Sequence, residues 1–112
     1  MAQNFRRLLL AGVGTTVADM PDGADFQHYN TVVGINLSNT TDNMILADVY
    51  VTDSTPTPDV TVYIVKKAAI PAGSSIHIGG KFVLQSGDRL NFKSDTATSL
   101  DVIVSYVQEI ST

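Results

Sequence analysis

The chain has no cysteine, so it can form neither disulfide bonds nor thiolate metal sites. Its stability must therefore come from packing, backbone hydrogen bonds or partner subunits. Tryptophan is also absent, and aromatic residues make up only 7% of the sequence. Carbohydrate-binding sites combine clustered aromatic and polar side chains, so this scarcity counts against a function in sugar recognition.

Basic residues are few and scattered. Seven lysines and arginines stand against eleven acidic residues, which gives a formal net charge of −4. Only Arg6-Arg7 and Lys66-Lys67 are adjacent basic pairs. Nucleic-acid binding needs a basic stripe that displaces counterions from phosphates, so we expect no nucleic-acid partner.

Long apolar runs are missing as well. The run Leu8–Val13 is shorter than the roughly 7–15 residues of a signal-peptide core. It falls further below the about 20 residues that span a bilayer. We therefore expect neither a signal peptide nor a membrane partner.

Helical periodicity is absent too, whereas alternation of apolar and polar residues is common. A chain of 112 residues with 44% hydrophobic content can form one domain with a real core. We expect a single domain over residues 1–112, folded as an all-β, antiparallel β-sandwich of about eight or nine strands with Greek-key or jelly-roll-like connections. Residues 1–12 are expected to form an extended N-terminal arm.

Four alternating segments predict long strands. In the first, Val33, Ile35 and Leu37 are expected to face the core together. Another, Val60–Lys66, is apolar or tyrosine on both faces, so it is expected either to be central in a sheet or to have one face covered by a partner. The four segments are Thr31–Ser38, Met44–Thr52, Val60–Lys66 and Leu100–Ile110.

The stretch Ala68–Asp95 predicts three short strands, because turn-forming residues interrupt it three times. Each predicted strand carries two large apolar residues spaced by two, which places both on one face. These pairs are Ile76 and Ile78, Phe82 and Leu84, and Leu90 and Phe92.

Two features could suggest a metal site. The loop residues Asp19, Asp22 and Asp25 offer carboxylates, but their spacing lacks the alternating ligands of a calcium loop, and turn-forming aspartate explains them better. His77 alternates with core isoleucines and should face solvent or an interface, and His28 lies in a loop. A metal needs three or four converging ligands, so we expect no metal and no other cofactor.

Catalytic motifs are also missing. No serine lies in a G-x-S-x-G turn, no glycine-rich phosphate loop precedes a helix, and the sequence alone does not pair carboxylates across a cleft. We expect no catalytic residues and no enzymatic activity.

Tyr50 and Tyr63 fall on the less apolar faces of two strands that are expected to pair as a hairpin. They could stack across the strands on a solvated surface. They could equally be anchors of an interface, since tyrosine is enriched there. The sequence leaves both interpretations open.

From Thr31 to Glu109 the order of segments is strand, Asx-rich turn, strand, I-P-A-G-S-S, G-G-K-x-V-L-x-x-G-D-x-L and a terminal D-V-I-V-S-Y. This order resembles small β-sandwich virion structural proteins of tailed bacteriophages, of the capsid decoration or cement type. The resemblance implies a protein without enzymatic activity that works as assembled copies on capsids or tails. The segments that carry it are Val32–Asn39, Ala47–Asp53, Val62–Ile76, Gly79–Leu90 and Ser99–Glu109.

The same resemblance implies partners and a location. Decoration proteins commonly form trimers on a capsid shell, so we expect a homotrimer bound to the major capsid protein, on the capsid surface of a virion made in a bacterial cytoplasm. The N-terminal third departs from the family pattern, so a tail, neck or fibre-adaptor component is a second hypothesis. A carbohydrate-binding β-sandwich for host adhesion is a third.

The arm is the expected contact segment, because decoration proteins often lay such arms against capsid subunits or neighbouring copies. In Ala2–Leu10, three leucines follow two arginines, and a short apolar run needs a cover. We expect deletion of residues 2–10 to leave the sandwich folded and to abolish particle binding. The expected partner-interface residues are Phe5, Arg6, Leu8, Leu9, Tyr50 and Tyr63.

Overall fold

A computed structural model describes residues 2–20, 30–54, 58–79, 81–85 and 87–110 of the chain. This part contains nine strands and no helix. The strands are β1 (Ala2–Val13), β2 (Ala18–Met20), β3 (Asn30–Asn39), β4 (Ile45–Asp53), β5 (Val60–Ile70), β6 (Ser75–Ile78), β7 (Phe82–Leu84), β8 (Asp88–Ser94) and β9 (Leu100–Ile110).

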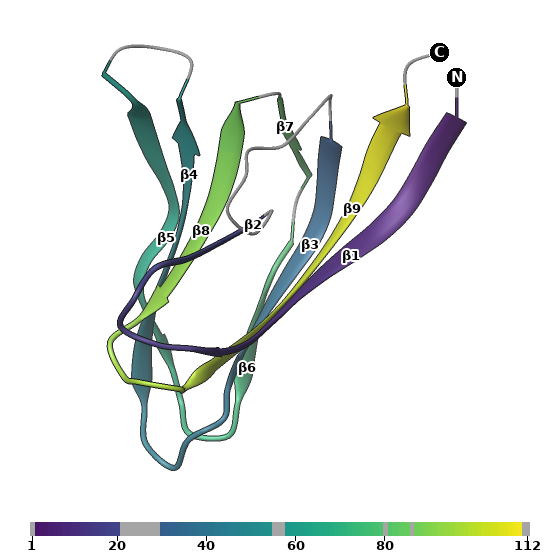
Figure 1. The fold of residues 1–112 in the computed structure, drawn as a ribbon. Coiled ribbons are helices and arrows are strands. Elements are labelled where there is room, and N and C mark those ends of the chain that lie inside the picture. The colour runs from purple at the N-terminus through teal and green to yellow at the C-terminus, as the bar shows by residue number, and fades with distance from the viewer. Residues whose placement is uncertain (1, 21–29, 55–57, 80, 86, 111–112) are drawn as a thin grey trace.

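The strands form two antiparallel sheets that face each other (Figure 1). Sheet A has the order β1-β9-β3-β6, with β7 also paired to β3, and sheet B has the order β2-β8-β4-β5. The chain crosses between the sheets at every connection except β4–β5 and β6–β7. This is the jelly-roll arrangement, with β6 and β7 sharing one strand position. The predicted all-β sandwich is confirmed, and its connections are those of a jelly roll.

The core lies between the sheets and follows the predicted alternation closely. In β4, the side chains of Ile45, Ala47 and Val49 are fully buried, and their neighbours face outward. The short-strand pairs also contribute as predicted where the structure describes them, and Phe92 is the largest fully buried side chain. The remaining buried apolar residues are Val13, Val32, Ile35, Leu37, Ile70, Leu84, Leu90, Leu100, Val102 and Val104.

One predicted core position is wrong. Val33 was expected to share a face with Ile35, but its side chain is 41% exposed while Val32 and Ile35 are fully buried. The pairing of β3 with β9 shifts register between Val32 and Gly34. A bulge of this kind inserts one extra residue and reverses the side-chain alternation, so Val33 turns to the outer face.

The N-terminal segment is extended, as predicted, but it belongs to the sheet of its own chain. Residues Ala2 to Leu10 of β1 pair with Ile110 to Val102 of β9 without a register shift. The side chains of Leu8 and Leu10 pack against the core. Deletion of residues 2–10 would therefore remove a paired strand, and the expectation that the sandwich would survive this deletion no longer holds.

Strand β5 ends sheet B, so the prediction that this segment could be central in a sheet is wrong. Its first half, from Val60 to Tyr63, is exposed on both faces. The other alternative, an apolar strand with one face that a partner could cover, is compatible with the fold.

Candidate functional site

The outer face of sheet A carries exposed apolar side chains among polar ones such as Arg7, His77 and Ser105. Four large side chains point away from the core there, and we call them the apolar face: Leu9 (55% exposed), Val33 (41%), Val83 (57%) and Ile103 (45%). They come from β1, β3, β7 and β9, and Leu9 is paired directly with Ile103. The outer face of an antiparallel sandwich is normally polar, so an apolar outer face indicates an interaction surface.

The structure separates the residues that were predicted to form one contact site on the arm. Leu9 lies on the apolar face, whereas Leu8 points to the other side of β1 and is half-buried against the core. Arg6 is exposed and is paired with Tyr106 of β9. For Phe5 the structure describes only the backbone, which is paired with Val107. Contact through these residues remains a prediction, and alternation along β1 means that they cannot all share one surface.

The outer face of sheet B has a different character. Asp19, Asn91, Tyr50 and Tyr63 are paired in succession across its four strands, so they form one row. The Tyr50 and Tyr63 rings lie 4.9 Å apart between centroids, with an angle of 39° between their planes. Lys66 adds its ammonium group 5.2 Å from the centre of the Tyr63 ring. The two rings thus lie against each other across the strands, which was one of the two interpretations that the sequence left open, and the role of this pair as interface anchors remains a prediction.

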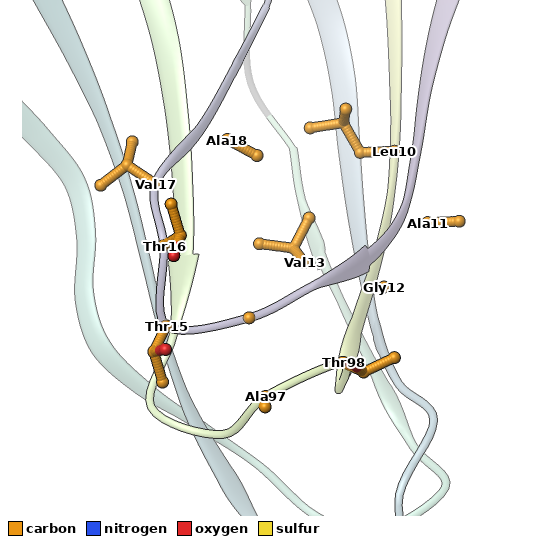
Figure 2. A pocket seen from close by; sticks show the side chains of 11 residues that line it. Leu10, Ala11, Gly12, Val13, Thr15, Thr16, Val17, Ala18, Ala97 and Thr98 are labelled. Atoms are coloured by element: carbon orange, nitrogen blue, oxygen red, sulfur yellow. The ribbon is translucent and has the colours of Figure 1, made fainter.

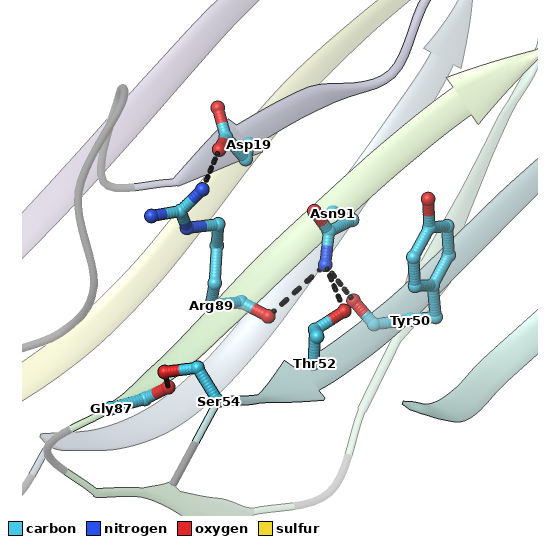
Figure 3. Close-up of polar contacts among 7 residues, drawn as sticks. All are labelled: Asp19, Tyr50, Thr52, Ser54, Gly87, Arg89 and Asn91. Carbon is cyan, nitrogen blue, oxygen red and sulfur yellow. Dashed lines mark hydrogen bonds and ion pairs between the residues drawn. The ribbon is translucent and has the colours of Figure 1, made fainter. Parts of the chain in front are cut away.

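Hydrogen bonds hold the polar residues beside the tyrosines (Figure 3). The Asn91 side-chain amide donates to the Tyr50 carbonyl (3.3 Å), the Thr52 hydroxyl (3.1 Å) and the Arg89 carbonyl (3.2 Å). Arg89 also pairs with Asp19, at 2.9 Å between Nη1 and Oδ2. These groups bind one another beside a hollow of about 320 Å³ that is lined by Thr52, Ser54, Asp59, Arg89 and Asn91, and they fix the surface that carries the tyrosines.

The Tyr50 hydroxyl provides a pH test of this surface. Burial raises the pKa of Tyr50, and the neighbouring Tyr63, Asp48 and Asp19 raise it further. Because the folded state favours the neutral phenol, Tyr50 should ionise above pH 10, and folding stability should fall as the pH rises through that transition. We expect the absorbance titration of the wild type minus that of Tyr50→Phe to show a tyrosine transition above pH 10. In the unfolded chain the midpoint of this difference titration should lie at about pH 10. The same midpoint in the folded and unfolded states would contradict the burial of Tyr50.

The residues considered for metal binding do not come together in the described part of the chain. His77 is exposed on β6, opposite Asn36, and Asp19 is paired with Arg89. Asp22, Asp25 and His28 lie outside the described residues. Within residues that the structure does describe, no group of three or more histidine, cysteine or acidic side chains could hold a metal ion.

A hollow of about 410 Å³ lies where the chain bends from β1 to β2, beside the turn between β8 and β9 (Figure 2). Its lining consists of small or apolar side chains and threonines, without an ionisable group. Such a lining supplies no acid, base or activated nucleophile. The lining residues are Leu10, Ala11, Gly12, Val13, Gly14, Thr15, Thr16, Val17, Ala18, Ala97 and Thr98.

Another hollow, of about 330 Å³, lies beside the outer face of sheet B and is lined by charged residues that include Lys67 and Lys93. Its carboxylates hold the local backbone. Asp48 accepts a hydrogen bond from the Lys67 amide at 2.6 Å, and Asp95 accepts one from the Leu46 amide at 3.0 Å. The first of these bonds lies where the pairing of β4 with β5 shifts register, so the Asp48 carboxylate has a structural role there.

Sequence reasoning missed three members of the apolar face: Val33, Val83 and Ile103. One signal was present, because two of the positions that alternate with the core positions of the last strand, Ile103 and Val107, are apolar. No helix long and apolar enough to cross a membrane occurs among the described residues.

Comparison with known proteins gives a likeness of fold alone. No protein-family model matches the sequence, and no curated protein matches it. Among solved structures, the core of Drosophila NLP, described for pentamer formation and histone binding, matches 98% of this chain and 100% of its own at 14% identity, with a TM-score of 0.54. A Bacillus endospore appendage protein, from a family of disulfide-linked pili, matches 98% and 88% at 14% identity, with a TM-score of 0.54. VP2 of infectious bursal disease virus, in a subviral particle, matches 98% of this chain and 37% of its own at 8% identity, with a TM-score of 0.50. The chain therefore shares its β-sandwich fold with a viral particle protein and a pilus protein, among others.

Proposed function

We propose that this chain is a non-enzymatic structural protein of a bacteriophage particle, and specifically a decoration protein that binds the outer capsid shell. The observation that carries the proposal is a jelly roll with an apolar outer face built from β1, β3, β7 and β9. The ordered motifs between Thr31 and Glu109 and the fold shared with VP2 support it. The proposal includes a homotrimer and the major capsid protein as partner.

The apolar face is the surface that we assign to the shell. Burying an exposed leucine or isoleucine side chain contributes roughly 1.5–3 kcal/mol, so several such side chains could drive attachment. A subunit that binds the assembled shell, but not loose capsid subunits, favours the assembled state by mass action. The stacked tyrosines lie on the outer face of the other sheet, so they would not take part in this contact with the shell.

Substitution of Ile103 by lysine tests this assignment. The side chain is exposed in the free protein, so Ile103→Lys should fold normally but place a charge in the contact. We expect binding to shells that lack the chain to weaken about tenfold or more, which corresponds to roughly 1.4 kcal/mol. Measurement is by co-sedimentation with shells and by occupancy in cryo-electron microscopy.

The matched control is Thr61→Lys, which adds the same charge at an exposed position of β5 in sheet B. It should bind shells like the wild type. Equal binding by both variants would reject the apolar face as the contact. Density on the tail or neck instead of shell facets would favour the tail, neck or fibre-adaptor alternative.

A second candidate function is carbohydrate binding for host adhesion, and the Tyr50–Tyr63 stack is the observation that favours it. Two adjacent rings with polar neighbours can form a platform for a sugar ring. A glycan array probed with the wild type and with Tyr63→Ala tests it. An array without hits would set this function aside.

A further inference from the structure

Strand β1 leaves a long, regular edge on sheet A. It is the terminal strand of the sheet and is paired only on the side of β9 among the described strands. From Ala2 to Leu10 this pairing has no register shift. Its charged side chains are Arg6 and Arg7, and three leucines follow them. A long regular edge with unpaired backbone groups is a template for another strand.

The other described edges are short or interrupted. Strand β2 has three residues, β6 has four and β7 has three. The β5 edge is long, but its pairing with β4 shifts register twice, and it carries Lys66 and Lys67. Lys67 also has a positive φ of 53°. Bulges and charged side chains are devices that prevent edge pairing; β1 carries Arg6 and Arg7, but its pairing has no register shift before Leu10.

We propose that β1 pairs antiparallel with β1 of a second copy of this chain, so that two A sheets join into one continuous sheet. This contact goes beyond the proposed attachment to a shell and does not depend on it. The occupant is a second copy because β1 can meet itself with its leucines covered and with no arginine directly opposite the same arginine of the other copy. Such a contact has two-fold symmetry, and each copy contributes the same surface, so it would join copies of two different trimers and would not form the trimer itself.

Two constraints select the register. Side chains that face outward in one copy must lie opposite outward-facing side chains of the other. Registers centred on Arg6 or Arg7 would place each arginine opposite its own copy, and like charges directly opposite are destabilising. A register centred on Phe5 separates the arginines but leaves Leu9 outside the paired segment. A register centred on Leu9 pairs fewer residues than one centred on Leu8, because the register shift beyond Leu10 lies closer to its centre.

The register centred on Leu8 meets both constraints. It places Leu8 opposite Leu8 of the second copy, Leu9 opposite its Arg7, and Leu10 opposite its Arg6. Leu9, now 55% exposed, would be covered.

Cysteine crosslinking tests the register directly, because the natural chain has no cysteine. Directly opposite pairs in an antiparallel ladder alternate between wide and close spacing. One of the two pairs Leu8–Leu8 and Arg7–Leu9 must therefore be the close kind, which suits a disulfide. We expect either Leu8→Cys alone, or an equimolar mixture of Arg7→Cys and Leu9→Cys, to form a covalent dimer on mild oxidation. Mass spectrometry of tagged chains identifies the mixed disulfide.

Leu9→Cys alone is the matched control, since its cysteines would be diagonal, roughly 7–8 Å apart, and should stay reduced. The mixture uses two exposed positions, so it remains informative if Leu8→Cys folds poorly. Absence of a disulfide in both tests would overturn the proposal. A disulfide that forms equally in the Leu9→Cys control would also overturn it, because the contact would then be non-specific.

Charge substitution separates edge pairing from packing of the apolar face. Leu9→Lys would place lysine opposite Arg7 of the second copy and should weaken self-association at least tenfold in sedimentation equilibrium. Val83→Lys changes an exposed residue on β7, away from the β1 edge, and should leave self-association unchanged. Equal weakening by both variants would show that the copies associate through the face instead. Because these measurements use the purified chain alone, their failure leaves the shell-binding proposal intact.

Discussion

Replacement of Phe92 by alanine is expected to lower the free energy of unfolding by about 3–5 kcal/mol. Phe92 is the largest fully buried side chain, and it sits on β8 between Ala18 of β2 and Val49 of β4. Its ring fills the space between the two sheets, so truncation leaves a cavity that its neighbours close only in part. For a domain of this size the melting temperature should fall by roughly 15–30 °C.

Urea unfolding followed by circular dichroism measures this loss. Phe92→Leu keeps most of the volume and should cost clearly less than the alanine variant. Val62→Ala, at an exposed position of β5, should stay within about 0.5 kcal/mol of the wild type. A loss below about 1 kcal/mol for Phe92→Ala would mean that the sheets do not pack on this ring as described.

Much of this core could be predicted because strand alternation is a local property. From Ile45 to Val51 in β4 and from Leu100 to Tyr106 in β9, every second residue is apolar, and a period of two places those residues on one face whatever the partner strand is. Turn residues divided Ala68–Asp95 into β6, β7 and β8 for an equally local reason. Where the alternation of side chains and the turn residues indicated the same strand, the predicted strand matches the observed one.

The position of Val33 depended on information that is not local. Val32 and Val33 are chemically identical, so either one could point inward. The register shift against β9, a strand more than sixty residues away, decides that Val32 is buried. A bulge is a property of two paired strands, and one strand read alone does not reveal it.

The candidate surface was predicted only in part for a related reason. The leucines before Gly12 do need a cover, but the sequence does not distinguish a strand of the same chain from a strand of a neighbour. Pairing with β9 covers Leu8 and Leu10 within the chain and leaves Leu9 outside. The apolar face could be assembled only once the topology had brought β1, β3, β7 and β9 into one sheet.

Replacement of Asn39 by aspartate should produce a large loss of stability that depends on pH. Asn39 is buried at the end of β3. Its side-chain NH₂ donates to the carbonyls of Asn43 (2.7 Å), Ile70 (2.9 Å) and Pro71 (3.2 Å). Its side-chain oxygen accepts hydrogen bonds from the Thr41 amide and hydroxyl, each at 2.8 Å. One amide therefore ties the β3–β4 turn to the end of β5.

Aspartate keeps the accepting oxygen but turns a second oxygen toward three carbonyls. We expect a loss of about 2–4 kcal/mol at pH 7, because buried carbonyls lose their donor and a charge is buried without a partner. The pKa of this aspartate should be raised in the folded state, since only its protonated form can donate to a carbonyl. Its contribution to stability is then greatest at low pH, and it is lost as the pH rises from about 4 through the folded-state pKa.

Asn39→Ala is the matched control, because it removes the same donors without adding an ionisable group. Its loss relative to the wild type should be similar at pH 4 and pH 7. The loss for Asn39→Asp should be clearly larger at pH 7 than at pH 4, as measured by urea unfolding at both values. If the two variants showed the same pH dependence, the amide would not be facing the carbonyls of Asn43, Ile70 and Pro71, and the link between the turn and β5 would have to be held by other groups.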